Sequence, residues 1–185
     1  MEVLDDKVYT IADILALPED VRAELIDGKI YLMPTRSTIH QQILGDLSLL
    51  IGNYIEDRNR PCRIYMGPLA VFINDERDCV EPDIVVICDP SKIKEDGCHG
   101  APDWVIEIIS PSTASHDYLR KAALYSNAGV REYWIVDPNN EIINVYNFGD
   151  EVYHPTQYDF DDQVKVGIYE DFVIDFTQFS LDSAE

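Results

Sequence analysis

The sequence predicts a mixed α/β (α+β) fold, in which helices flank a central mixed β-sheet. Residues 84–88 and 104–109 are almost entirely apolar, which is typical of central strands that are covered on both faces. The order of elements is the second observation: a helix, a hairpin, a long helix, several strands, another helix and more strands. With 185 residues, the chain is predicted to form one domain over residues 1–185.

Three helices are predicted from capping signals and apolar spacing. The first begins at Thr10, whose side chain can cap it, and ends before Pro18. A long helix begins at about Ser37, because the apolar residues after it recur every three to four positions. The third covers about residues 115–128 and ends at Gly129, a usual C-terminal stop.

The strands are predicted from apolar runs between turn signals. Asp27 and Gly28 form a tight turn between residues 24–26 and 29–33, because this pair accepts the positive φ angles of a hairpin. The apolar residues within 172–179 are expected to seal the core or to form a subunit contact. The remaining strands are expected at residues 63–66, 69–73, 84–88, 104–109, 133–137, 141–148 and 164–169.

The chain is strongly acidic. Its 35 acidic and 14 basic residues give a formal net charge of −21, which argues against sequence-blind binding to nucleic acid or anionic membranes. This net charge is compatible with a local nucleic-acid site at which bound cations neutralise the acidic side chains. No apolar run reaches the roughly 18 residues of a membrane span, and the first residues lack the pattern of a secretory signal. We therefore expect a cytoplasmic protein with no membrane partner.

The four cysteines predict no metal or redox motif. Cys62, Cys79, Cys88 and Cys98 form no CxxC pair, so their spacing matches neither a zinc ribbon nor a thioredoxin motif. In a protein without a secretory signal, reduced thiols are expected. All four are therefore predicted to pack as small hydrophobic side chains.

Two carboxylates lie in or beside the apolar strands. Asp83 directly precedes residues 84–88, and Glu107 lies inside residues 104–109. A buried carboxylate costs on the order of several kcal/mol unless a cation or a donor compensates it. Neither strand contains a lysine or an arginine. The compensation must therefore come from a basic side chain elsewhere, from a bound metal ion or from protonation.

The position of these carboxylates suits a hard cation. Two carboxylates at the ends of neighbouring strands can bind Mg²⁺, and a backbone carbonyl beside Glu107 could add a third oxygen ligand. The alternative is structural, with Asp83 capping a turn and Glu107 paired with an arginine. The place of Glu107 inside a strand argues against this alternative, because a structural pair is rarely found there.

Several short motifs follow one another in a fixed order. They are Glu24-Leu25-Ile26-Asp27-Gly28, Pro82-Asp83, Glu107-Ile108-Ile109-Ser110-Pro111-Ser112-Thr113, Asp117, Lys121 and Gly129-Val130-Arg131-Glu132-Tyr133-Trp134-Ile135-Val136-Asp137-Pro138. Together with His40, this set closely resembles the Uma-two family of endonucleases, which belongs to the PD-(D/E)xK, or restriction-endonuclease-like, superfamily. The resemblance extends from about Tyr9 to about Phe179.

The resemblance implies a restriction-endonuclease-like core, a metal-dependent phosphodiesterase site and a homodimer. By position, Asp83 and Glu107 would bind Mg²⁺ or Mn²⁺, and the backbone carbonyl of Ile108 would complete the set. Glu24 would match an acidic residue of the superfamily, which binds a second metal ion or positions a water. The alternative for Glu24 is a capping or solvated acid.

The chain departs from the superfamily pattern at the lysine expected two residues after the glutamate, where it has Ile109. In the Uma-two pattern the lysine comes from the following helix, which points to Lys121. Ile109 and Glu107 share one face of their strand, so a helix packed over that face could bring Lys121 there. The alternative is a surface pair between Asp117 and Lys121, worth only about 0.3–0.5 kcal/mol.

Other polar residues have two interpretations each. His40 could contact a substrate phosphate or be a partly buried structural histidine. Residues 110–113 are expected to cap the third helix, and their backbone donors could also contact a phosphate. The grouped basic residues could bind phosphate or form solvated surface; they are Arg58, Arg60 and Arg63, and Lys92 with Lys94.

The predicted function is metal-dependent hydrolysis of phosphodiester bonds in nucleic acid, DNA rather than RNA. Asp83 and Glu107 would hold the metal, and Lys121 would orient or deprotonate the attacking water. One alternative is a non-catalytic binding or assembly module of the same fold, which the acidic surface and Ile109 favour. Another is a metal-free hydrolase with paired carboxylates, such as a glycosidase, which leaves Lys121 without a role.

Overall fold

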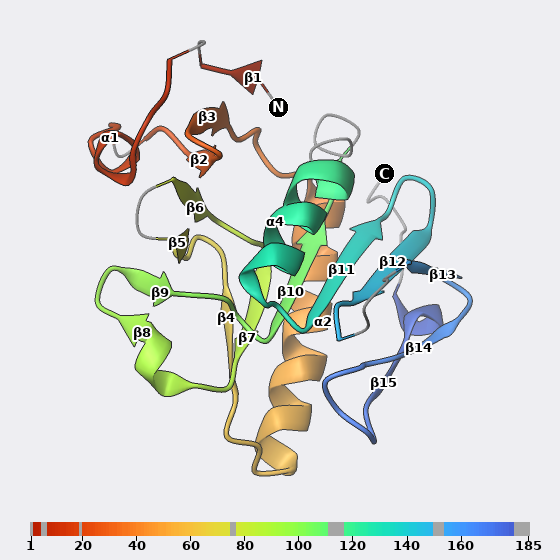
Figure 1. Ribbon diagram of the computed structural model, residues 1–185. Coiled ribbons are helices and arrows are strands. Elements are labelled where there is room, and N and C mark those ends of the chain that lie inside the picture. Colours follow the sequence, from red (N-terminus) through yellow and green to blue (C-terminus); the bar gives the residue numbers. More distant parts are fainter. Residues whose placement is uncertain are drawn as a thin grey trace.

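The fold places strands and helices in the mixed α/β arrangement that the sequence predicts. The computed structural model describes residues 2–4, 7–18, 20–74, 77–110, 117–149 and 154–179 (Figure 1). Within these residues, the strands form sheets of seven, six and two strands. The six-stranded sheet positions the candidate site.

The two apolar strands lie at the centre of the six-stranded sheet. β7 (Ile84–Ile87) pairs antiparallel with β10 (Trp104–Ile108), which runs parallel to β11 (Glu132–Asp137). Every residue of these three strands is buried, as predicted for strands covered on both faces. The outer strands are β12 (Ile142–Asn147) and β13 (Thr156–Asp159) beyond β11, and β4 (Arg63–Met66) beside β7.

The long helix α2 (Thr38–Asp57) covers one face of this sheet (Figure 1). Its start confirms the prediction, because Ser37 is the N-cap and its Oγ accepts a hydrogen bond from the N–H of His40. The buried face of the helix packs against alternate residues of β7 and β10. The members of this apolar face are Ile43, Leu47, Ile51 and Ile55.

A shorter helical segment covers the opposite face of the sheet (Figure 1). It consists of a π-helical turn, η2 (Asp117–Lys121), and of α4 (Ala122–Ala128). Gly129 ends α4 in the left-handed conformation, with φ of 88°, as predicted. The predicted N-terminal part of this helix, with its capping residues 111–113, lies outside the described residues. None of the described helices is both long and apolar enough to cross a membrane.

The seven-stranded sheet is built around the predicted hairpin. β2 (Ala23–Ile26) and β3 (Lys29–Leu32) flank the turn, where Asp27 and Gly28 have φ of 49° and 71°. The first helix, α1 (Ile11–Leu15), packs beside β2 and begins at the predicted cap Thr10. The other strands of this sheet are β1 (Glu2–Val3), β5 (Val71–Asn74), β6 (Asp78–Val80), β8 (Ile93–Lys94) and β9 (Gly97–His99).

The C-terminal segment closes the core on the α2 side. β14 (Gln163–Lys165) and β15 (Val173–Asp175) form the two-stranded sheet, and Phe176 packs against Trp134 with ring centroids 6.2 Å apart. Phe179 is buried in the same cluster, which agrees with the prediction that this segment seals the core. Short 3-10 turns, η1 (Pro90–Lys92) and η3 (Phe176–Gln178), complete the described elements.

A buried carboxylate ties the C-terminal segment to the sheet. Glu132, at the start of β11, is fully buried. Its Oε1 accepts hydrogen bonds from the indole N–H of Trp134 at 2.6 Å and from the N–H of Gly167 at 2.9 Å. Its Oε2 accepts from the N–H of Ile168 at 2.8 Å. One side chain therefore satisfies three donors from two distant segments.

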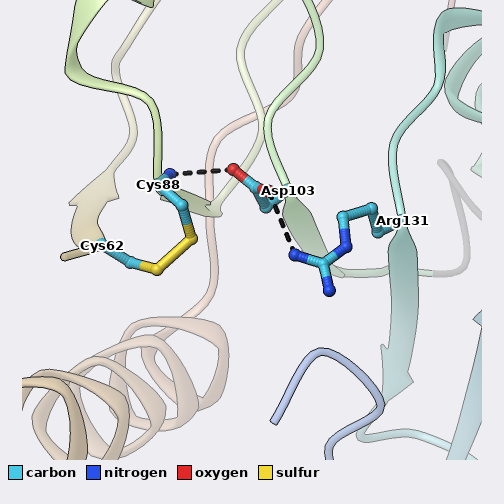
Figure 2. The surroundings of a disulfide bond; sticks show 4 residues. All are labelled: Cys62, Cys88, Asp103 and Arg131. Atoms are coloured by element: carbon cyan, nitrogen blue, oxygen red, sulfur yellow. Dashed lines mark hydrogen bonds and ion pairs between the residues drawn. A yellow bond between two sulfur atoms is a disulfide. The ribbon is translucent and has the colours of Figure 1, made fainter. Parts of the chain in front are cut away.

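The prediction that all four cysteines are reduced is wrong for two of them. Cys62 and Cys88 form a disulfide (Figure 2). Its cause is the register of β4 and β7: Arg63 pairs with Ile87, so the next positions outward are the two cysteines. Register is a long-range property, which the spacing of cysteines in the sequence does not reveal.

A hydrogen bond and an ion pair connect the disulfide to the starts of β10 and β11. Figure 2 shows Asp103 between Cys88 and Arg131. The carboxylate of Asp103 accepts a hydrogen bond from the N–H of Cys88 at 2.8 Å and lies 3.3 Å from Arg131 Nη1.

The other two cysteines, Cys79 and Cys98, are buried thiols, as predicted. Burial raises the pKa of Cys79 to about 12 and that of Cys98 to about 11, so both stay protonated at neutral pH.

Reduction of the Cys62–Cys88 bond is expected to lower the free energy of unfolding by about 2 kcal/mol. The bond spans 26 positions and restricts the unfolded chain, so its loss raises the entropy of that state. Urea unfolding with and without a reductant measures the effect. The double variant Cys62→Ser, Cys88→Ser is the control, because reductant cannot change its stability at these positions. Equal unfolding midpoints for the parent under both conditions would contradict the prediction.

Candidate active site

The predicted site residues gather at one end of the six-stranded sheet. Ile84 of β7 pairs with Ile106 of β10, so Asp83 and Glu107 are the next positions on the two strands. Asp83 is 5% exposed and Glu107 is 2% exposed. Both carboxylates are therefore buried and need the compensation that the sequence predicts.

Lys121 compensates Glu107. Its Nζ lies 2.8 Å from Glu107 Oε1 and also 2.8 Å from Glu24 Oε1. The three residues come from η2, from β10 of the six-stranded sheet and from β2 of the seven-stranded sheet. This lysine thus joins the two sheets through one buried ammonium group. Since Lys121 is only 2% exposed, the alternative of a surface pair with Asp117 is wrong.

The cluster of Glu24, Glu107 and Lys121 has one more carboxylate than it has ammonium groups. Tyr125 adds a hydrogen bond, because its hydroxyl donates to Glu107 Oε1 at 3.0 Å. Glu24 Oε1 also accepts the N–H of Glu81 at 3.0 Å. Glu24 Oε2, in contrast, is buried without a hydrogen-bond partner among the described residues. An unpartnered carboxylate oxygen inside a protein favours a further cation or donor at this point.

Asp83 is compensated by a different set of residues, at the start of α2. Arg36 Nη2 lies 3.0 Å from Asp83 Oδ1, and His40 Nε2 lies 3.1 Å from Asp83 Oδ2. The N–H of Ile108 donates to the same Oδ2 at 2.8 Å. Ile108 directly follows Glu107, so this hydrogen bond connects Asp83 to the strand that carries Glu107.

These contacts decide the protonation state of Asp83. Burial by itself would raise the pKa of Asp83. The contact with His40, the charge of Arg36 and the N–H of Ile108 outweigh burial and hold the pKa of the carboxyl below its usual range. Asp83 is therefore ionised at neutral pH, as a residue that binds cations must be.

Burial and contacts decide between the alternative interpretations of the other candidate residues. Glu24 is fully buried, which excludes a solvated acid. His40 is 3% exposed and contacts Asp83, so it is a buried histidine beside the site. The basic side chain at 2.8 Å from Glu107 is a lysine, where the structural alternative expects an arginine. The roles of Glu24, Asp83, Glu107, Ile108 and Lys121 in metal binding and catalysis are proposals.

The grouped basic residues do not lie in this cluster. Arg58 and Arg60 both form ion pairs with Asp171, at 3.0 and 2.8 Å, where they connect the end of α2 to the C-terminal segment. Lys92 donates to the carbonyl of Ala101 at 2.7 Å. Arg63 and Lys94 are exposed, as expected for solvated surface.

Two residues of the site, Tyr125 and Arg36, are not among those predicted from the sequence. Tyr125 lies four positions after Lys121, which places both side chains on one face of a helical segment, and this spacing could have indicated it. Arg36 precedes the N-cap of α2, and no local signal distinguishes it from a surface arginine. Its importance follows only from the packing of the helix start against Asp83.

The donor set fits a divalent cation. Within the described part of the chain, no three carboxylate, imidazole or thiol side chains lie together as a metal site. The predicted set needs only two carboxylates and one backbone carbonyl, all of them the oxygen ligands that Mg²⁺ prefers. The unpartnered Glu24 Oε2 and the excess of negative charge also favour a cation here.

Comparison with known proteins agrees with the fold class that the sequence predicts. The Uma2 family, described as "putative restriction endonuclease", matches residues 11–177. An uncharacterized protein of Synechocystis sp. is 32% identical over 129 residues, which cover 69% of this chain and 67% of that protein. The crystal structure of an Anabaena variabilis protein, described as a putative nuclease of DUF820, has a TM-score of 0.74 and 26% identity. The match covers 92% of this chain and 96% of that one.

Proposed function

This chain belongs to the Uma2 family, and from that premise we propose that it is a metal-dependent nuclease that cleaves phosphodiester bonds in DNA. The observation that carries the proposal is the buried ammonium group of Lys121, held between Glu107 and Glu24 beside Asp83. The superfamily places a lysine on the strand of the glutamate. Here a helical segment supplies it, at hydrogen-bond distance from that glutamate.

The chemistry of the proposed reaction divides among four side chains. Asp83 and Glu107, with the carbonyl of Ile108, would hold Mg²⁺ or Mn²⁺. When bound, such an ion polarises the phosphate and lowers the pKa of a coordinated water. Lys121 would orient the attacking water and stabilise the negative charge that develops on the phosphate. Glu24 would hold Lys121 in place and accept a hydrogen bond from a water through its unpartnered Oε2.

Asp83→Asn is expected to weaken Mn²⁺ binding and to slow DNA cleavage at least about 100-fold, because the amide lacks the charge that attracts the ion. Titration calorimetry measures the binding, and conversion of supercoiled plasmid measures cleavage. Asp161→Asn is the matched control, since Asp161 is exposed and loses the same charge. An RNA of the same sequence, assayed in parallel, tests the choice of DNA.

Two results would overturn the proposal. If Asp83→Asn cleaved DNA as fast as the Asp161→Asn control, the site assignment would be wrong. If the parent neither bound Mn²⁺ nor cleaved DNA or RNA, the fold would serve as a non-catalytic binding module.

Substrate binding is expected to depend steeply on ionic strength. The net charge of −21 repels nucleic acid as a whole, so binding relies on a local site and on bound cations. Fluorescence anisotropy of a labelled DNA duplex, measured with Ca²⁺ over a series of salt concentrations, gives this dependence. An affinity that stays constant across the series would show that ionic contacts do not control binding.

A further inference from the structure

A small pocket of about 220 Å³ lies next to Asp83, at the start of α2. Arg36 and His40 line it, and both side chains also contact Asp83. Thr35 and Asn139 also line the pocket; Thr35 lies at its exposed rim, and Asn139 follows β11. The pocket therefore shares two side chains with the candidate active site without being part of its carboxylate cluster.

Arg36 and His40 each use one nitrogen for Asp83 and have another nitrogen without a partner. Arg36 Nε and His40 Nδ1 are buried and lack a hydrogen-bond partner among the described residues. The His40 side chain is 4% exposed and the Arg36 side chain 12% exposed. Buried nitrogens of this kind are normally satisfied, and both belong to side chains that line the pocket, so a ligand that accepts hydrogen bonds here would supply the missing partners. Arg36 Nε carries a hydrogen and can only donate, and an imidazole nitrogen that carries its hydrogen donates in the same way.

The start of α2 adds positive potential to the same pocket. Ser37, its N-cap, lines the pocket, and the helix extends over 20 residues behind it. The N–H groups of the first turn point toward the helix start, and the aligned peptide dipoles favour an anion there. The pocket thus combines a helix N-terminus with an arginine and a buried histidine.

We infer that this pocket binds a backbone phosphate of the nucleic acid, adjacent to the phosphate that is cleaved. The inference rests on the proposed function and adds a second phosphate contact to it. A phosphodiester is a compact anion with several acceptor oxygens, which matches the donors and the size of the pocket. Arg36 and His40 contact Asp83 with their other nitrogens. A phosphate in the pocket would therefore be separated from Asp83 only by these two side chains.

The test uses the metal-free protein and thymidine 3′,5′-bisphosphate as the probe. Titration calorimetry gives its affinity, and the ring ¹⁵N resonances of His40 report whether it binds in this pocket. Thr35→Glu adds a negative charge at the rim without touching Asp83, and Thr35→Gln is the uncharged control of the same shape. A unit charge at this range is expected to weaken binding about tenfold in the Glu variant, with the Gln variant close to the parent.

The possible results separate this inference from the proposed function. Equal affinities for the Glu and Gln variants, or a probe that leaves the His40 resonances unchanged, would overturn the pocket assignment. Inorganic phosphate that binds as tightly as the bisphosphate would overturn the backbone assignment in favour of a free-phosphate site. Since the assay requires no cleavage, a protein that binds the probe in this pocket but cleaves no nucleic acid would refute the nuclease proposal alone.

Discussion

Replacing Lys121 with methionine is expected to slow cleavage about 1,000- to 10,000-fold and to lower the free energy of unfolding by about 3–5 kcal/mol. Methionine keeps much of the volume of the side chain and removes its charge. Glu24 and Glu107 would then be two buried carboxylates without the ammonium group that lies 2.8 Å from each of them. The loss of activity follows from the missing charge at the phosphate, and the loss of stability from the unpaired carboxylates.

A second substitution separates the two effects. Glu24→Gln in the Lys121→Met background removes one of the two charges, so part of the stability is expected to return while cleavage does not. Lys165→Met serves as the control for the lost charge, because Lys165 is exposed in β14. Plasmid cleavage and urea unfolding are the two measurements. Cleavage by Lys121→Met within tenfold of the parent would remove Lys121 from the proposed mechanism.

Glu132→Ala is expected to lower the free energy of unfolding by about 3 kcal/mol, because it leaves three donors around this buried carboxylate without their acceptor. These donors are the indole of Trp134 and the N–H groups of Gly167 and Ile168. Urea unfolding measures the change. Glu170→Ala is the control, since Glu170 is exposed. A variant as stable as this control would show that the three hydrogen bonds do not hold the C-terminal segment in place.

The same residue gives a signature in pH. Burial raises the pKa of Glu132, although the three donors oppose the effect. The folded state therefore binds the proton more tightly than the unfolded state does. Protonation of Glu132 therefore stabilises the folded state fully at pH values below the ordinary pKa of a glutamate. This stabilisation is lost as the pH rises through the raised pKa of the folded state. Glu132→Gln cannot titrate, so the stability of the parent relative to this variant is expected to fall across that range.

The elements with strong local signals could be predicted from the sequence. The hairpin at Asp27 and Gly28, the cap at Ser37 and the stop at Gly129 all depend on the conformational preferences of a few neighbouring residues. The short strands of the seven-stranded sheet could not, because two or three residues are too few to establish a period. The strands missed in this way are β1, β6, β8 and β9.

The candidate site was predictable only in part, for a similar reason. Asp83 and Glu107 were recognisable because a charged carboxylate in or beside an apolar strand is costly to bury and therefore unusual. Lys121 was recognisable only through the resemblance to the Uma-two pattern, in which the lysine comes from the helix after the strand. The contacts of Arg36 with Asp83 connect residues 47 positions apart, and only the packed structure brings them together.

The disulfide makes part of the main chain into a covalent ring, and Asp83 lies within it. The ring contains β4 to β7, so Asp83 is linked to β4 along the backbone in one direction and through the sulfur atoms in the other. A single proteolytic cut inside the ring would leave one molecule, which separates into two fragments only on reduction. A nicked protein that kept its cleavage activity without reductant and lost it with reductant would identify the sulfur bridge as the connection that keeps Asp83 in position.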